Sequence, residues 1–279
     1  MNMWAWLLVL GCIQGCFQFE GAIKKDAQRF EKEHPDGFRT TSVAGRSVRW
    51  AQVGDPAKQR VLFIHGSPGS WDVWAGFLND PTLSSQFFLV APDRLGYGGS
   101  CKGCVVASLK VQADALLPAL AGAGPAIVVG HSLGGPIAVR LAMDHPDRVA
   151  ALILVAGSID PSQEKIAWYQ YPGSWVPLRW ILPSALDVCN RELMPLKREL
   201  EALLPLWSQL KMPVEVIQGM DDNLVPPANA DFAERMLTSG NLKVTRVPGM
   251  NHFVPWAHPE LIRAAILRQA ETMHPTVAR

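Results

Sequence analysis

The chain carries little charge of either sign. Charged residues make up 18% of its 279 residues, the formal net charge at pH 7 is +1, and no basic stripe occurs. Without a basic stripe a protein lacks the electrostatic footprint of nucleic-acid binding, so we expect no nucleic-acid partner. Internal repeats, low-complexity tracts, phosphate-binding loops and the G-x-G-x-x-G signature are also missing. We therefore predict that the protein uses no nucleotide or other cofactor.

Long hydrophobic runs are missing near the N-terminus. The apolar stretch from Trp4 to Ile13 is too short to span a bilayer but has the length of a signal-peptide core. Gly15-Cys16 stand shortly after this stretch, and the sequence then turns polar. This pattern resembles a bacterial lipobox. The resemblance implies lipidation of Cys16, or of Cys12 as second candidate, and a membrane-anchored or periplasmic place in the bacterial envelope. A plain cleaved signal or a buried N-terminal helix is the alternative.

Cysteine is scarce, with five in the chain. The spacing of Cys101 and Cys104 suits a small disulfide in an oxidising compartment or, less readily, metal binding. A metal site needs two more soft ligands nearby, and none is present, so we predict no metal.

Apolar runs without alternation indicate strands buried on both faces, as in a parallel sheet. Six such runs occupy residues 60–65, 87–92, 126–131, 151–156, 214–219 and 242–249. Residues 40–55 alternate instead, with a hairpin turn expected at Gly45-Arg46. Helical patterns cover residues 108–123, 132–145, 227–237 and 259–271. This rhythm predicts an α/β fold with a mostly parallel, doubly wound sheet, which binds ligands at the carboxyl ends of its strands.

The rhythm breaks at residues 161–210, which contain no strand pattern but are rich in tryptophan and tyrosine. We interpret this stretch as a helical lid, with Trp168 and Trp175 expected to line the substrate pocket. The alternative is that these rings only anchor the lid. The predicted organisation is a lipoprotein-type signal segment over 1–16, a spacer over 17–39, a core over 40–160 and 211–279, and the lid.

Ser132 lies in a G-x-S-x-G sequence, Gly130 to Gly134, directly after a buried strand and at the start of a helix. Such a turn is strained and lifts the hydroxyl above the sheet, so the flanking residues must be small. The alternative is a glycine-rich turn that contains serine by chance. It does not account for the histidine and aspartate candidates described next.

A serine needs a base to accept its proton and an acid to orient that base. His252 follows the last predicted strand, with His258 as rival, and Asp221 and Asp222 follow the strand before it. All these groups converge on one edge of the sheet, in the chain order serine, aspartate, histidine.

With these motifs the sequence resembles the α/β-hydrolase family from about residue 40 to the C-terminal helix. The family pattern G-x-x-D-x-[LIV]-V-P matches residues 219–226 and implies that Asp222 is the acid, and G-x-x-H-F matches residues 249–253 and implies that His252 is the base. The H-G-x-P pattern at residues 65–68 implies an oxyanion hole formed by the amides of Ser67 and Leu133. The order of a lipoprotein-type cysteine followed by the hydrolase core also resembles bacterial envelope hydrolases of this family.

Two neighbouring stretches are interpreted as supporting structure. His65 is expected to brace the oxyanion loop rather than move a proton, because no orienting acid can be named for it. Asp93 and Arg94, in the turn that follows the next strand, are expected to be structural.

We expect a serine esterase that cleaves a carboxylic ester, thioester or lactone of a small acyl substrate with an apolar portion. The same fold hosts carbon–carbon bond hydrolases, cofactor-free peroxidases and acyltransferases, which are the alternatives. A non-catalytic binding protein is a remote one, because every triad position is filled.

Overall fold

The computed structural model describes residues 19–122, 124–166, 170–173, 183–238 and 240–273. An eight-stranded sheet in the order β1-β2-β4-β3-β5-β6-β7-β8 runs through the molecule. The strands are β1 (Phe38–Val43), β2 (Arg46–Val53), β3 (Arg60–Ile64), β4 (Phe88–Pro92), β5 (Ala126–His131), β6 (Val149–Val155), β7 (Val214–Gly219) and β8 (Leu242–Val247). All neighbours from β4 to β8 pair in parallel, and this confirms the predicted fold class.

The edge hairpin of β1 and β2 is antiparallel, and β2 also pairs antiparallel with β4. Its turn lies at Ala44 and Gly45, one residue earlier than the sequence predicted. Both residues have positive φ, 49° and 76°. Two-residue turns of that kind match the twist of the flanking strands, so the two positive φ values fix the register of the hairpin.

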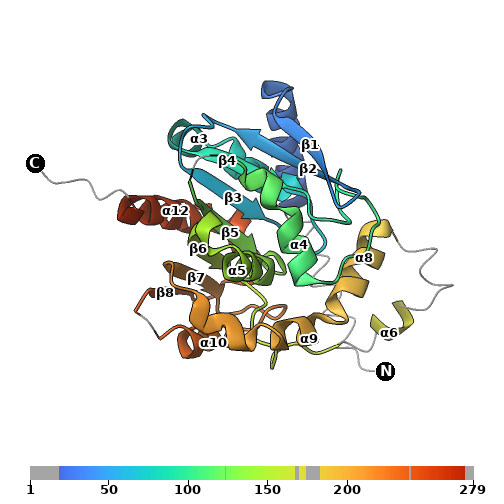
Figure 1. Ribbon diagram of the computed structural model, residues 1–279, viewed down its shortest axis with the longest axis vertical. Coiled ribbons are helices and arrows are strands. Elements are labelled where there is room, and N and C mark those ends of the chain that lie inside the picture. The colour runs from blue at the N-terminus through green and yellow to red at the C-terminus, as the bar shows by residue number, and fades with distance from the viewer. Residues whose placement is uncertain (1–18, 123, 167–169, 174–182, 239, 274–279) are drawn as a thin grey trace, which may run out of the picture.

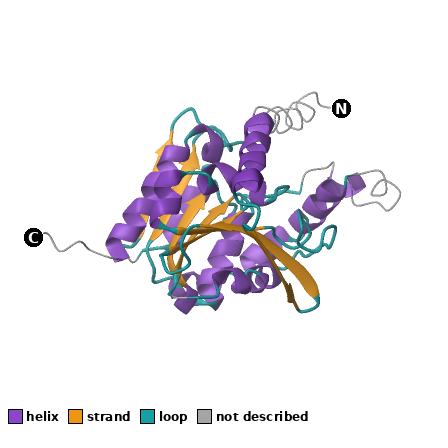
Figure 2. Cartoon of the chain, turned by 90° about the horizontal axis from the view of Figure 1, so that it is seen from above, coloured by secondary structure: helices purple, strands orange, loops and turns teal. Residues whose placement is uncertain are grey.

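Helices cover both faces of the sheet (Figure 2). On one face lie α4 (Leu109–Ala115), α5 (Gly134–Asp144) and α10 (Ala228–Met236), and on the other lies α12 (Pro259–Met273). Along β3, Leu62 and Ile64 belong to the first core while Val61 and Phe63 belong to the second. Because both faces are covered, every residue of β3 is buried, which explains the continuous apolar sequence from Val61 to Ile64.

Two helices are shorter than the sequence predicted. α4 ends at Ala115, and a separate 3₁₀ segment, η2 (Leu117–Leu120), follows. Pro118 in that segment has no amide hydrogen to continue the α-helical ladder. α5 begins at Gly134 rather than at Ser132, because the backbone of Ser132 has a φ of 54° and cannot be helical.

Further short helical segments lie between strands or after the last strand. Those between strands are η1 (Trp71–Trp74), α2 (Ala75–Leu78), α3 (Pro81–Gln86) and η3 (Pro146–Arg148), and α11 (Val254–Ala257) follows β8.

The predicted spacer over residues 17–39 is corrected by the structure. Residues 19–33 form a helix, called here the N-terminal helix, and β1 begins at Phe38. Phe30 of this helix is fully buried, with its ring 5.3 Å from that of Trp71 and 5.8 Å from that of Phe38. The helix is therefore part of the folded body.

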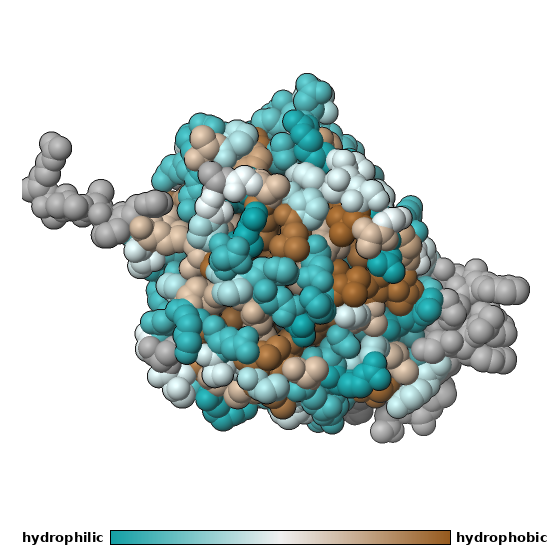
Figure 3. Space-filling view, viewed as in Figure 1, coloured by the Kyte–Doolittle hydropathy of each residue, from teal (hydrophilic) through white to brown (hydrophobic). Residues whose placement is uncertain are grey.

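Between β6 and β7 the chain leaves the sheet and forms α6 (Gln170–Gly173), α8 (Ser184–Leu193), α9 (Leu196–Glu201) and η4 (Leu204–Gln209). Figure 1 shows α8 on the side toward which β3 points, at the carboxyl ends of the parallel strands. Figure 3 shows an apolar surface area in the region of α4 and α8. Within the described ranges, no helix has the length and apolar character needed to cross a membrane.

Candidate active site

Ser132 sits in a strained turn between β5 and α5. Its φ of 54° lies in the left-handed region, and its amide donates to the carbonyl of Val155. A Cβ atom on Gly130 would lie 2.5 Å from the Gly134 carbonyl oxygen, and one on Gly134 would lie 2.3 Å from that of Ile64. Both glycines are therefore required for the backbone to pass so closely, as the sequence pattern predicts.

His252 and Asp222 are in direct contact beyond the ends of β8 and β7. His252 Nδ1 lies 2.8 Å from Asp222 Oδ2, and both side chains are buried. The other carboxylate oxygen of Asp222 accepts the amides of Leu224 at 2.9 Å and Val225 at 2.8 Å. These two amides fix the carboxylate so that it faces the imidazole.

The rival residues lie elsewhere. Asp221 is exposed, and its amide donates to the carbonyl of Met250. His258 contacts the exposed carboxylate of Glu260 at 2.9 Å. Of the two candidates for each role, the structure brings Asp222 and His252 together.

His131, the neighbour of Ser132, packs behind His252, a contact that sequence reasoning missed. Its ring centroid lies 4.7 Å from that of His252, and its Nε2 is 3.1 Å from the His252 carbonyl oxygen. Burial, and then the nearby His252, lowers the pKa of His131 to about 3. The ring is therefore neutral near pH 7, with Nε2–H donating to the carbonyl. No local sequence signal marks this contact, since the two residues are 121 positions apart.

The loop after β3 lies against Ser132. A Cβ atom on Gly66 would be 2.7 Å from the Cβ of Ser132, so only glycine allows this approach. Within the described part of the chain, the amides of Ser67 and Leu133 donate to no acceptor. Two unused amides near the serine hydroxyl are the donors that an oxyanion would need.

In the described ranges Ser132 Oγ makes no hydrogen bond of its own. Hydrogen bonds between a nucleophile and its base are often long in proteins without substrate and tighten on binding.

His65 braces the loop after β3, the structural role that the sequence favours. It is fully buried, its Nδ1 lies 2.8 Å from the Gly66 carbonyl oxygen, and its Nε2 accepts the amide of Arg94 at 3.0 Å. Burial, followed by the positive charge of Arg94, lowers the pKa of His65 well below its usual value. A neutral ring with both nitrogens occupied holds the loop and has no free atom for a proton.

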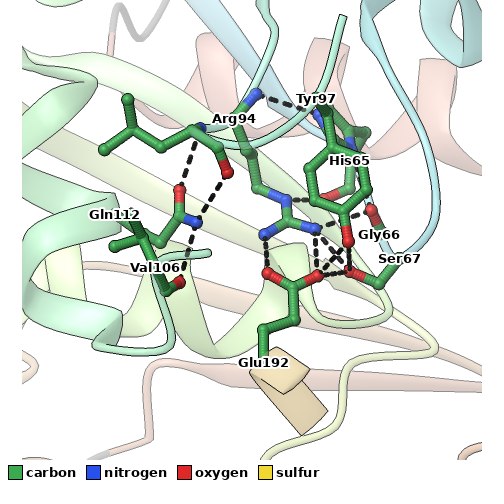
Figure 4. A network of polar contacts seen from close by, with 9 residues as sticks. His65, Gly66, Ser67, Arg94, Tyr97, Val106, Gln112 and Glu192 are labelled. Atoms are coloured by element: carbon green, nitrogen blue, oxygen red, sulfur yellow. Dashed lines mark hydrogen bonds and ion pairs between the residues drawn. The ribbon is translucent and has the colours of Figure 1, made fainter. Parts of the chain in front are cut away.

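Arg94 connects this loop to the insertion (Figure 4). Its guanidinium donates to the carbonyls of His65 at 3.0 Å and Gly66 at 2.9 Å, and to Ser67 Oγ at 2.5 Å. The same group pairs with Glu192 of α8 at 3.0 Å. Burial alone lowers the pKa of Arg94, but the Glu192 carboxylate outweighs burial and raises it.

Glu192 also accepts hydrogen bonds from Ser67 Oγ and from the Tyr97 hydroxyl (Figure 4). Burial, and then the charge of Glu192, raises the pKa of Tyr97 far above its usual range, so this hydroxyl keeps its proton. The sequence predicts a structural role for Arg94. It does not indicate that Glu192, 98 positions away, is the partner of this arginine. Asp93, also buried, accepts the amides of Trp71 and Gly99 at 2.9 Å and 2.8 Å.

Cys101 and Cys104 form a disulfide after β4. Three other predicted residues, Trp168, Trp175 and Cys16, lie outside the described residues, as does Cys12.

Comparisons with known proteins agree with this architecture. The model of the alpha/beta hydrolase fold family matches residues 59–181. The lipase LipV of Mycobacterium tuberculosis is 30% identical over 188 residues, covering 66% of this chain and 65% of that protein. A solved membrane phospholipase A superposes with a TM-score of 0.68 over 97% of each chain at 19% identity, a likeness of fold.

A second relative is the dihydrolipoyllysine-residue acetyltransferase component of the acetoin cleaving system of Cupriavidus necator. It is 37% identical over 128 residues, which are 45% of this chain and 33% of that protein. The chain thus spans only 33% to 38% of the length of the two acetyltransferase components that it matches.

Proposed function

Because the chain belongs to the α/β-hydrolase fold family, we propose that it is a serine hydrolase that cleaves a carboxylic ester, thioester or lactone through an acyl-enzyme. Ser132 is the nucleophile, His252 the base and Asp222 the orienting acid. The observation that carries the proposal is the 2.8 Å contact between His252 and Asp222, at the sheet edge where Ser132 projects. The relative named as a lipase also supports ester chemistry.

The reaction follows from this geometry. Asp222 holds the Nδ1–H tautomer of His252, which leaves Nε2 free to accept the Ser132 proton while Oγ attacks the carbonyl carbon. The amides of Ser67 and Leu133 donate to the oxyanion. The tetrahedral intermediate then expels the alcohol, which takes the proton from Nε2. Water, deprotonated by His252, attacks the acyl-enzyme, and the acid leaves with Ser132 restored.

The direct test is the Ser132→Ala variant, assayed on p-nitrophenyl acyl esters of graded length. Loss of the nucleophile should reduce kcat by about 10⁴-fold or more. Its unfolding curve should match that of the parent protein, which separates lost chemistry from lost fold. A variant that keeps most of the ester hydrolysis would remove Ser132 from the mechanism.

Two lid residues belong to this proposal as substrate contacts. Trp168 and Trp175 would bury part of the apolar chain, since each buried methylene contributes about 0.8 kcal/mol. Their alanine variants should change chain-length selectivity while the acyl-enzyme still forms. Unchanged selectivity in both variants would leave these rings as anchors of the lid.

The location is also part of the proposal. A lipidated Cys16, after removal of the preceding apolar segment, would hold the enzyme on a membrane of the bacterial envelope. A single acyl chain binds membranes only marginally, so stable anchoring needs more than one chain on the cysteine. Expression of the full-length gene in a bacterium, followed by intact mass measurement and detergent partitioning, tests it. A cytosolic, unmodified chain beginning at Met1 would refute it, and a lipid at Cys12 would move the site.

A further inference from the structure

A cavity of about 560 Å³ lies between the N-terminal helix, the loop after β3, the turn after β4, the start of α8 and the segment that follows His252. Its lining is mainly apolar and includes Phe19, Ile23, Val73, Tyr97, Phe253 and Trp256. Charged side chains, those of Glu20, Asp72 and Lys102, also contribute to the lining. A concave, mainly apolar lining with a few polar groups is the usual composition of a small-molecule site.

The cavity lining includes chain neighbours of two candidate catalytic groups. Pro68 and Gly69, which line it, directly follow Ser67, whose amide is a proposed oxyanion donor. Phe253, which also lines it, directly follows His252. The cavity is therefore built from the same two loops that would position the oxyanion and the base.

The N-terminal helix forms another wall of the cavity, and it packs against the segment that follows His252. The ring of Phe19 lies 6.0 Å from the rings of both Phe253 and Trp256. Trp256 in turn donates from Nε1 to the Val73 carbonyl at 3.1 Å. These contacts connect three of the lining segments through aromatic side chains.

This wall is held firmly. Phe30, further along the same helix, is fully buried, and the Asn79 side chain donates to the Asp26 carbonyl at 2.8 Å. A helix fixed at these points presents Phe19 and Ile23 as a permanent surface of the cavity.

We propose that this cavity binds the apolar chain of the substrate, so that the N-terminal helix forms part of the substrate site. This inference rests on the proposed ester hydrolysis and names the substrate class as esters with a long aliphatic chain. Contact with the loops of Ser67 and His252 makes such a chain, extending from an ester at Ser132, the occupant that fits. The chain belongs either to the acid or to the alcohol of the ester, and the experiment separates the two.

The test fills the cavity with Ile23→Trp in the full-length protein. Gln28→Trp, on an exposed position of the same helix, is the matched control. Each buried methylene is worth about fourfold in affinity, so exclusion of a long chain should lower kcat/KM by about tenfold or more. We expect this loss on p-nitrophenyl decanoate or on decyl acetate, whichever chain occupies the cavity. The rates of Ile23→Trp on p-nitrophenyl acetate and ethyl acetate should stay within about twofold of those of the parent protein. Gln28→Trp should leave the rates on both the long and the short esters unchanged.

A binding measurement keeps this inference distinct from the proposed reaction. Decanoate and decanol are each titrated calorimetrically into Ser132→Ala, and the one whose chain occupies the cavity should bind about tenfold more weakly when Ile23→Trp is added, but not when Gln28→Trp is added. Unchanged affinity for both molecules, or equal losses on short and long esters, would overturn the inference. If no ester is cleaved but binding of either molecule depends on Ile23, the reaction fails and the cavity assignment stands. Ile23→Ser, which removes the apolar wall with little risk to folding, provides a second variant with the same expected direction.

Discussion

Arg94 and Glu192 form a buried ion pair that joins the sheet to the insertion. Arg94 Nη1 lies 3.0 Å from Glu192 Oε2, and the two side chains are 0% and 2% exposed. Because Arg94 also donates to the carbonyls of His65 and Gly66, the position of α8 and that of the loop after β3 depend on the same guanidinium.

Removing Glu192 should therefore destabilise the protein strongly. Glu192→Ala leaves the Arg94 charge buried and uncompensated, which typically costs about 3–5 kcal/mol of unfolding free energy. Arg191→Ala, which removes a partly exposed pair with Asp187 on the same helix, should cost less than about 1 kcal/mol. Urea unfolding of both variants measures the difference. Equal small losses would show that the buried pair contributes little.

Asp222 and Asp221 should differ sharply as asparagine variants. In Asp222→Asn the side-chain oxygen can still accept the amides of Leu224 and Val225, which turns the NH₂ group toward His252 Nδ1. That donor favours the wrong imidazole tautomer, so kcat should fall by about 10⁴-fold. Asp221→Asn should change kcat by no more than about twofold. Steady-state kinetics of both variants on one ester measure the two values of kcat. A larger fall in kcat for Asp221→Asn would reverse the assignment of the acid.

Stability should depend on pH through His131. The usual pKa of histidine, 6.5, applies to the unfolded chain, whereas burial lowers it to about 3 in the folded protein. Between these values the unfolded chain binds the proton, so the contribution is complete above pH 6.5 and is lost as the pH falls toward 3. The loss approaches about 1.4 kcal/mol per pH unit.

The comparison protein for this prediction is His131→Gln, which keeps a side-chain N–H but does not titrate. The free energy of unfolding, measured in urea at pH 7, 6, 5 and 4, should depend on pH less steeply in the variant. The difference should correspond to the uptake of about one proton on unfolding. His65 shifts stability in the same direction in both proteins, so its effect cancels. Identical slopes would show that His131 is charged in the folded state or that its burial is incomplete.

Two glycine-to-alanine variants should have opposite effects. Gly134→Ala would bring a Cβ within 2.3 Å of the Ile64 carbonyl oxygen, a backbone atom, and should lower unfolding free energy by about 1–3 kcal/mol. Gly21 lies in the N-terminal helix, where an added Cβ meets nothing within 4 Å. Gly21→Ala should raise unfolding free energy by about 0.5–1 kcal/mol. A neutral or negative effect at Gly21 would speak against a stable helix there.

Several parts of the fold were predictable because their signal is local. The run of residues 126–131 coincides with β5, which is buried along its whole length and is therefore apolar from Ala126 to Val129. The G-x-S-x-G turn was likewise readable, because Gly130 and Gly134 meet backbone atoms directly. Ser108, predicted to start a helix, caps α4 by accepting the amide of Val111.

Other parts depend on contacts between distant residues or on a weak pattern. Nothing near Arg94 or Glu192 in the sequence indicates that they pair, because the contact exists only once the insertion folds back. The N-terminal helix did carry a signal: Phe19, Ile23, Ala27 and Phe30 recur at helical spacing. Many charged residues stand between these apolar residues and weaken the stripe, so the sequence alone favours a spacer.

The early start of the N-terminal helix limits how far a membrane anchor could let the enzyme move. Phe19 stands three positions after Cys16, and three extended residues span at most about 11 Å. A lipid on Cys16 would thus be a short tether, ending beside the cavity that Phe19 helps to line. Confinement within such a reach raises the effective concentration of neighbouring molecules without any new contact. An enzyme tethered in this way would meet esters dissolved in the bilayer far more often than esters in solution, so proximity would add to the selectivity of its pocket.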